Sequence, residues 1–171
     1  LADISAGRAP LTVAQRPPEV RPEVIQETAN RRHANLSAAY NDNIAGRLDS
    51  AAIERYGLTA RDVHALPRYQ QEVRDLVTTQ LVMEAHSSYN ARTGETPEIR
   101  LNKLVEAYES FAAGTLDRAG MERYRLTDAN LTRFARIHEQ AEALVGEKLM
   151  RRAVRWATDE AQTGFSQIGV R

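Results

Sequence analysis

The sequence predicts an all-α fold, and three of its properties support that prediction. Ala, Leu, Arg, Glu and Gln, which favour helices, dominate its 171 residues. Aromatic residues make up only 6%, and nine glycines and six prolines are too few for the turns of an all-β domain. Apolar residues also recur at every fourth position in two long stretches. We therefore expect a helical protein about the size of one ordinary domain.

The chain resembles itself when it is shifted by 68 positions. Between positions 36 and 85, 18 of the 50 residues are identical to the residue 68 positions further on, without a gap. The shared pattern, A-Y-x(4)-A-G-x-L-D-x-A-x(2)-E-R-Y-x-L-T, begins at Ala39 and again at Ala107. We interpret this as a tandem duplication of a long helix–short helix–long helix unit, packed as a helical bundle or as stacked α-hairpins.

This interpretation divides the chain into four segments. Residues 1–21 contain prolines without apolar periodicity and are expected to form an extended linker. Residues 22–95 are the first copy, 96–163 the second copy, and 164–171 a C-terminal tail. Because the chain starts with Leu1 rather than methionine, we expect it to be a piece of a larger protein.

In the first copy, proline, glycine and aspartate indicate the first two helices. A long helix is expected to start near Pro22, where proline is tolerated in the first turn, and to run to Ala45. Gly46 follows as its stop. Asp49 then provides a side-chain acceptor at the start of a short helix that ends at Tyr56.

The third helix of the first copy begins with Thr59-Ala-Arg-Asp62, which has the spacing of a capping box. Pro67 lies inside it, and proline both removes a backbone donor and clashes with the preceding turn. We therefore expect the helix either to kink at Pro67 or to restart near Arg68.

The second copy repeats these signals. Thr96 is the expected N-cap of its first helix and Gly114 the stop, while Asp117 caps the short helix that ends at Tyr124. No proline interrupts the last helix, which we expect to run from 128 to about 163.

Apolar periodicity predicts the buried faces of the two last helices. The residues expected to face the core are Val73, Val77, Leu81 and Ala85 in one copy and Val145, Leu149, Ala153 and Trp156 in the other. The recurrent Tyr40, Tyr56, Tyr108 and Tyr124 are expected to pack their rings in the core with the hydroxyl at its edge; a ligand pocket is the alternative. The recurrent Glu-Arg pairs at 54–55 and 122–123 are interpreted as structural.

The search for catalytic chemistry is mostly negative. Without cysteine there is no disulfide, zinc ribbon, iron–sulfur cluster or thiol nucleophile. His33, His64, His86 and His138 form no metal-ligand spacing, and no phosphate loop, dinucleotide fingerprint or nucleophile elbow is present. We therefore assign no catalytic, cofactor or metal residue, although a triad assembled from distant residues remains an alternative. No apolar run approaches the length of a membrane span, and we expect a soluble chain.

One feature of the second copy is missing from the first. Lys148, Arg151, Arg152 and Arg155 stand at i, i+3, i+4 and i+7, on one face of the last helix, with Trp156 at its edge. The residues 68 positions earlier are Gln80, Met83, Glu84 and Ser87, so the scaffold does not require these charges. They are interpreted as a site for an acidic partner or a phosphate-bearing ligand, with an ordinary solvated helix face as the alternative.

The sequence thus predicts a non-catalytic helical protein–protein interaction module of a larger protein. The alternative is a nucleic-acid-binding domain that uses Lys148, Arg151, Arg152, Arg155 and Trp156. Lys and Arg number 23 against 23 Asp and Glu, and this balance argues against strong nucleic-acid binding. The Arg-rich, Lys-poor composition favours a bacterial source, such as a secreted effector or a mobile-element protein. The residues do not decide between a cytoplasmic protein and one delivered by a specialised secretion system, and they do not indicate an oligomeric state.

Overall fold

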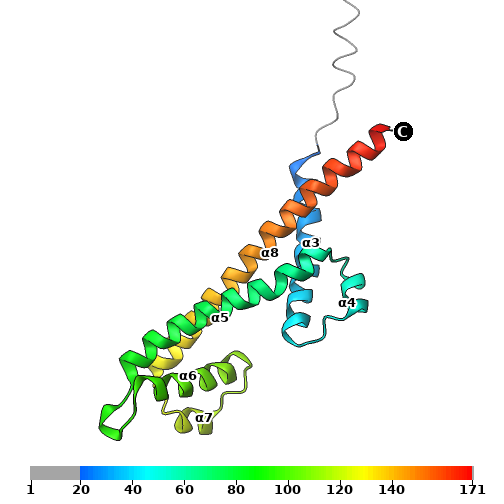
Figure 1. The fold of residues 1–171 in the computed structure, drawn as a ribbon. Coiled ribbons are helices and arrows are strands. Elements are labelled where there is room, and N and C mark those ends of the chain that lie inside the picture. Colours follow the sequence, from blue (N-terminus) through cyan, green and yellow to red (C-terminus); the bar gives the residue numbers. More distant parts are fainter. Residues whose placement is uncertain (1–19, 171) are drawn as a thin grey trace, which may run out of the picture. The chain divides into compact units, whose positions relative to one another are not determined.

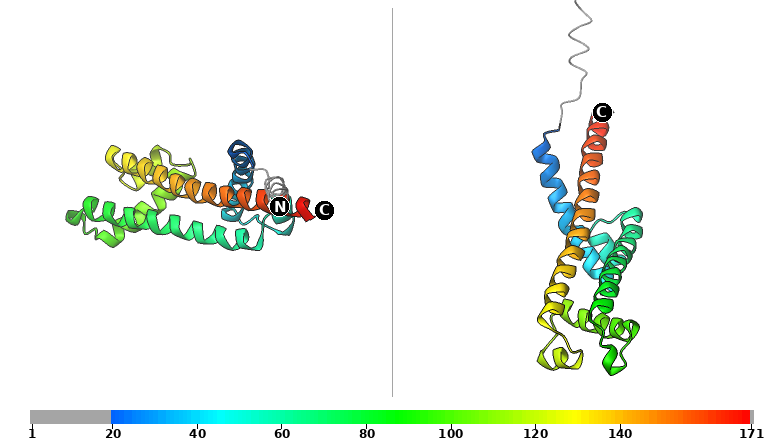
Figure 2. Two further views of the ribbon diagram at one scale, coloured as in Figure 1. Left: turned by 90° about the horizontal axis from the view of Figure 1, so that it is seen from above. Right: turned by 90° about the vertical axis from the view of Figure 1, so that its left-hand side faces the viewer.

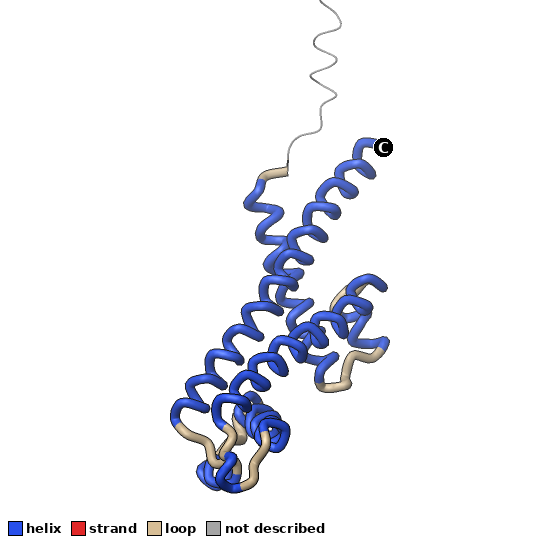
Figure 3. Tube along the Cα trace, turned by 60° about the vertical axis from the view of Figure 1, so that its left-hand side comes forward, coloured by secondary structure: helices blue, strands red, loops and turns tan. Residues whose placement is uncertain are grey.

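A computed structural model describes the backbone of residues 20–170 and the side chains of residues 20–163. The described part is helical, without strands, as predicted (Figure 3). The helices are α3 (Pro22–Ile44), α4 (Ser50–Arg55), α5 (Ala60–Ser88), α6 (Pro97–Ala112), α7 (Arg118–Arg123) and α8 (Asp128–Val170), with a 3-10 turn at Ala91–Thr93 (Figure 1). Most of the predicted linker, residues 1–19, lies outside the described residues.

The residues divide into two compact units. Residues 37–149 form one, here called the central unit, and the described residues 20–36 and 150–170 belong to the other, the terminal unit. Both α3 and α8 contribute residues to each unit. This division by contacts differs from the predicted boundary between 95 and 96, which is drawn from sequence similarity, and so it does not test that boundary.

The predicted caps are confirmed in atomic detail. The amide of Ala52 donates to Asp49 Oδ1 and that of Gly120 donates to Asp117 Oδ1, both over 2.8 Å. Thr59 and Asp62 form the predicted capping box, with the Thr59 amide donating to Asp62 Oδ2 over 2.9 Å. These bonds satisfy backbone donors that have no partner inside their helices.

Two helices differ from their predicted extents. The helix α5 runs through Pro67 without restarting at Arg68, so that alternative is wrong. Pro67 is exposed, and its missing amide leaves the Val63 carbonyl without its usual helical donor. The helix α8 continues past position 163 to Val170, into the segment expected as a tail.

The core of the central unit combines residues from three helices. Its buried members are Leu81 and Ala85 on α5, Leu104, Ala107 and Tyr108 on α6, and Phe134 and Ile137 on α8. Phe134 meets the Tyr108 ring edge-on, with ring centroids 5.7 Å apart. Because α5 lies in the predicted first copy and the other two in the second, residues of both predicted copies share one core.

Within the central unit, α5 lies antiparallel to the first part of α8, as the two views of Figure 2 also show. Near the end of α5, Glu84 accepts a hydrogen bond from Asn130 Nδ2 over 2.7 Å. Nearer its start, Glu72 Oε2 lies 2.7 Å from Lys148 Nζ. Later positions of α5 therefore contact earlier positions of α8, as expected for antiparallel helices.

The terminal unit pairs the start of α3 with the later part of α8. Ala29 and Leu36 on α3 are buried, as are Ala153 and Ala157 on α8. Arg32, itself only 4% exposed, places its guanidinium carbon 4.5 Å from the centre of the Trp156 ring. A cation over an aromatic face at this distance stabilises the pairing of the two helices.

Candidate functional site

The five residues predicted as a binding site have different surroundings. Lys148, in the central unit, forms an ion pair with Glu72, with 2.7 Å between Lys148 Nζ and Glu72 Oε2. The same Nζ lies 5.5 Å from the centre of the Tyr69 ring. Its side chain is 30% exposed. Lys148 therefore joins α8 to α5, and its charge is largely compensated.

The other four predicted residues lie in the terminal unit. Arg152 and Trp156 are half-buried, and Arg32 covers one face of the Trp156 ring. Arg151 and Arg155 are exposed, and so is Val154 between them, at 36%. We call Arg151, Val154 and Arg155 the α8 arginine face, because their spacing places them on one side of the helix.

The corresponding side of α5 is also exposed. The residues 68 positions before the α8 arginine face are Met83, His86 and Ser87, and all three are exposed. Helix packing thus leaves the same side of the two helices open to solvent, and the two sides differ only in residue type. The positive charge on this side of α8 therefore comes from arginines that α5 does not have at the equivalent positions.

A buried arginine connects the polar groups of the central unit. Arg100 is only 3% exposed, and burial lowers its pKa. Its Nη1 donates to the Tyr124 carbonyl over 2.6 Å, and its Nη2 donates to the Arg125 carbonyl and to Asn130 Oδ1 over 3.2 Å. Its Nε donates to Ser88 Oγ. Arg100 therefore satisfies acceptors from the ends of α5 and α7 and the start of α8, which is a structural role.

A buried carboxylate holds the junction before α6. Glu95 is 6% exposed and accepts hydrogen bonds from Lys103 Nζ over 2.8 Å, from Arg125 Nη2 over 2.6 Å and from the Asn90 amide over 3.0 Å. Burial alone would raise the pKa of Glu95, but these donors outweigh it and lower the pKa from 4.5 to about 2. Glu95 therefore stabilises the fold as an anion.

We expect a pH-dependent loss of stability on replacing Glu95 with glutamine. Because the folded pKa lies below the unfolded one, the ionised group stabilises the fold above pH 4.5, and this contribution is lost as the pH falls towards 2. The side chains of Lys103 and Arg125 are 36% and 43% exposed, so solvent weakens their ion pairs with Glu95. The expected loss in the free energy of unfolding at pH 7 is therefore about 1–2 kcal/mol. Urea unfolding of both proteins across this pH range measures it; a difference that does not shrink below pH 4.5 would contradict the assignment.

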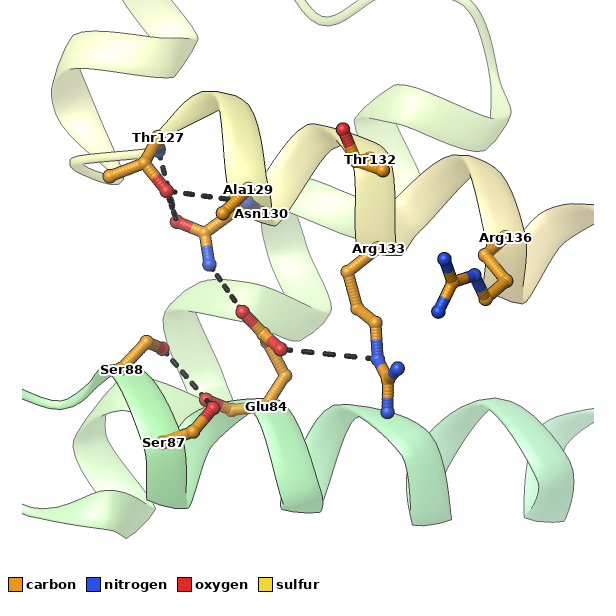
Figure 4. A pocket seen from close by; sticks show the side chains of 9 residues that line it. All are labelled: Glu84, Ser87, Ser88, Thr127, Ala129, Asn130, Thr132, Arg133 and Arg136. Carbon is orange, nitrogen blue, oxygen red and sulfur yellow. Dashed lines mark hydrogen bonds and ion pairs between the residues drawn. The ribbon is translucent and has the colours of Figure 1, made fainter.

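Beside Arg100 the central unit contains a polar pocket of about 570 Å³. Its lining comes from the end of α5 and the start of α8, and consists of Glu84, Ser87, Ser88, Thr127, Ala129, Asn130, Thr132, Arg133 and Arg136 (Figure 4). Sequence reasoning missed this pocket, because its two halves are about forty residues apart and form no motif. The spacing of Arg133 and Arg136 on one helix was the available signal.

The pocket has no arrangement for nucleophilic catalysis among its described side chains. The hydroxyls of Ser87 and Ser88 donate to the Glu84 carbonyl, and the Thr127 hydroxyl donates to Asn130 Oδ1. A serine or threonine nucleophile needs instead a base that accepts its proton. Within residues 20–163, no group of three or more His, Asp or Glu side chains is placed to hold a metal ion.

Comparison with known proteins does not identify this site. No protein-family model matches the chain, and neither a curated protein nor a solved structure matches it. Among the described helices, none combines the length and apolar character that crossing a membrane requires.

Proposed function

We propose that this chain is a helical interaction module and that the α8 arginine face binds an acidic segment of a protein partner. The observation that carries the proposal is the exposure of Arg151, Val154 and Arg155 on one side of α8. Arginine is enriched at protein interfaces and pairs with carboxylates through two parallel hydrogen bonds. An exposed valine between two arginines suits a partner segment that has an apolar residue among acidic ones.

The surroundings of Trp156 favour a protein partner over a nucleic acid. Stacking on a base requires an open aromatic face, and Arg32 occupies one face of the half-buried Trp156 ring. Lys148, the fourth cation of the predicted site, is paired with Glu72. Two exposed arginines in a neutral chain supply few phosphate contacts, so binding to DNA should be weak and salt-sensitive.

A tandem duplication of one helical unit is the second part of the proposal. Its support is that several helix bounds recur at an offset of 68 positions. The short helices α4 and α7 cover 50–55 and 118–123, and α5 and α8 begin at 60 and 128. A duplicated unit explains why α4 and α7 have the same length and an aspartate N-cap each, and why the helices that follow them begin at equivalent positions.

Contacts at equivalent positions give further support. In the terminal unit Arg32 lies over Trp156, and 68 positions away Arg100 donates to Ser88 in the central unit. Within the central unit, Asn43 Nδ2 donates to Gln70, and at the equivalent positions the rings of Phe111 and His138 meet edge-on. Each pair joins the same two positions, although the chemistry of the contact has changed.

Charge reversal on the α8 arginine face tests the proposed interaction. The double variant Arg151→Glu/Arg155→Glu keeps the half-buried Arg152 intact, so the fold is expected to be retained. The matched control is Arg61→Glu/Arg68→Glu, which makes the same charge change at two exposed positions of α5. Unfolding curves of both variants establish that the fold is intact.

We expect the wild type and the control variant to retain a partner protein from native cell extract. The Arg151→Glu/Arg155→Glu variant should retain that protein at least about tenfold more weakly. The retained protein should contain an acidic segment, and a peptide of that segment should bind the isolated wild-type chain. Equal retention by the two variants would contradict the proposal. Tight binding of generic DNA by the wild type at low salt, lost in the α8 variant, would favour nucleic acid instead.

A further inference from the structure

The polar pocket of the central unit contains a cation with no partner of its own. Arg136 is exposed, lines the pocket, and makes no hydrogen bond or ion pair within the part of the chain that the structure describes. In Figure 4 its guanidinium turns along α8 towards Arg133, one turn away. Two like charges at this spacing repel each other, and an anion placed between them would reverse that effect.

Arg133 also has unused hydrogen-bonding capacity. Its Nη2 donates to Gln80 Oε1 over 3.1 Å, but its Nε is buried without a hydrogen-bond partner. The nearest carboxylate oxygen, Glu84 Oε2, is 3.9 Å from that Nε, which is too far for a hydrogen bond. A buried N–H donor without an acceptor is costly, so a small shift of the Arg133 side chain that brings this Nε to an oxygen of a bound ligand would be favourable.

The carboxylate in the pocket does not compensate both arginines. Glu84 Oε1 accepts a hydrogen bond from Asn130 Nδ2 over 2.7 Å, which fixes this side chain on the side away from Arg136 (Figure 4). Asn130 is in turn held by Arg100 and by the Thr127 amide. Two arginines against one glutamate leave the pocket lining with an excess of one positive charge.

We propose that this pocket binds a small organic phosphate. The three terminal oxygens of a phosphate monoester can accept from both guanidiniums, whereas a single carboxylate has only two oxygens. The volume of about 570 Å³ lies within the range of small-molecule sites and exceeds what inorganic phosphate would fill. The exposed hydroxyl side chains of Ser87 and Thr132 suit an organic part that is itself rich in hydroxyl groups.

Calorimetric titration of the full chain with glucose 6-phosphate, inorganic phosphate, citrate and glucose tests this proposal. We expect glucose 6-phosphate to bind more tightly than inorganic phosphate or citrate, and neutral glucose not to bind. Replacing Arg136 with glutamine should weaken binding of glucose 6-phosphate about tenfold. The control Arg118→Gln removes an equal charge from a side chain that is 94% exposed on α7, and it should leave binding unchanged.

Several results would overturn the proposal. Binding of neither phosphate compound at millimolar concentration would exclude a phosphate site. Equal affinity for glucose 6-phosphate and inorganic phosphate would exclude an organic phosphate as the ligand, and tighter binding of citrate would exclude the preference for phosphate. Equal weakening by Arg136→Gln and Arg118→Gln would indicate attraction by net charge rather than a built site. Because Arg136 is exposed, its variant is expected to fold, and unfolding curves check this.

Discussion

Replacing Arg100 with methionine is expected to lower the free energy of unfolding by about 3 kcal/mol. Methionine has a similar length but no hydrogen-bond donors. The carbonyls of Tyr124 and Arg125 and the Asn130 amide oxygen would then lose a donor that reaches them through a side chain only 3% exposed. The penalty arises mainly at the Tyr124 and Arg125 carbonyls, which lose this donor, because Asn130 Oδ1 keeps its hydrogen bonds from the Thr127 amide and hydroxyl. Urea unfolding followed by circular dichroism measures the loss.

Two further variants make this test specific. Arg100→Lys keeps the charge but has a single nitrogen, so it should recover only part of the stability. Arg118→Met, at a side chain that is 94% exposed, should change the free energy of unfolding by less than about 0.5 kcal/mol. An Arg100→Met variant that unfolds within about 1 kcal/mol of the wild type would contradict the role assigned to this residue.

Replacing Phe134 with alanine is expected to cost about 3–5 kcal/mol, the largest effect of any substitution proposed here. Phe134 is fully buried, and its ring centre lies 5.7 Å from that of Tyr108 and 5.8 Å from that of Phe111. Alanine would leave a cavity where α6 and α8 meet and would remove both ring contacts. Thermal and urea unfolding should both report the loss.

The conservative variant Phe134→Leu should cost much less, about 1–2 kcal/mol, because most of the volume is retained. Met83→Ala provides the surface control, since Met83 is 56% exposed and should change stability by less than about 1 kcal/mol. If Phe134→Ala and Met83→Ala had similar effects, Phe134 would not lie in the core of the central unit.

Features of this fold that depend on neighbouring residues were predictable from the sequence. The caps at Asp49, Asp117 and Thr59 involve side chains and amides only three residues apart, so the local pattern determines them. The buried positions of Leu81 and Leu149 follow from helical periodicity. The all-helical fold class rests on the same short-range information.

Features that depend on distant partners were not predictable from the sequence. In the sequence Arg100 is an ordinary helical arginine, but its acceptors lie 12 residues before it and 24–30 residues after it. Lys148 was expected as part of an open cationic site, yet the antiparallel packing of α8 on α5 brings it to Glu72. The pocket that contains Arg133 and Arg136 likewise depends on that packing.

The candidate site was thus only partly accessible from sequence. Periodicity places Lys148, Arg151, Arg152 and Arg155 on one helix, but it does not say which of them packing leaves exposed. In the structure Arg151 and Arg155 are exposed, whereas Arg152 is half-buried. The proposed interface is therefore smaller than the predicted set of five residues, and it includes Val154, which the charge pattern did not select.

Site-specific photo-crosslinking tests the proposed interface most directly. A photoreactive phenylalanine analogue is placed at Val154 on α8 or, as the control, at His86, the exposed position of α5 that lies 68 residues earlier. The full-length protein is irradiated in its native cells. We predict a protein adduct at 154 that is absent at 86 and is lost when Arg151 and Arg155 are replaced by glutamate. The same adducts at both positions, none at 154, or an adduct at 154 that nuclease removes would contradict an interface with a protein at this face.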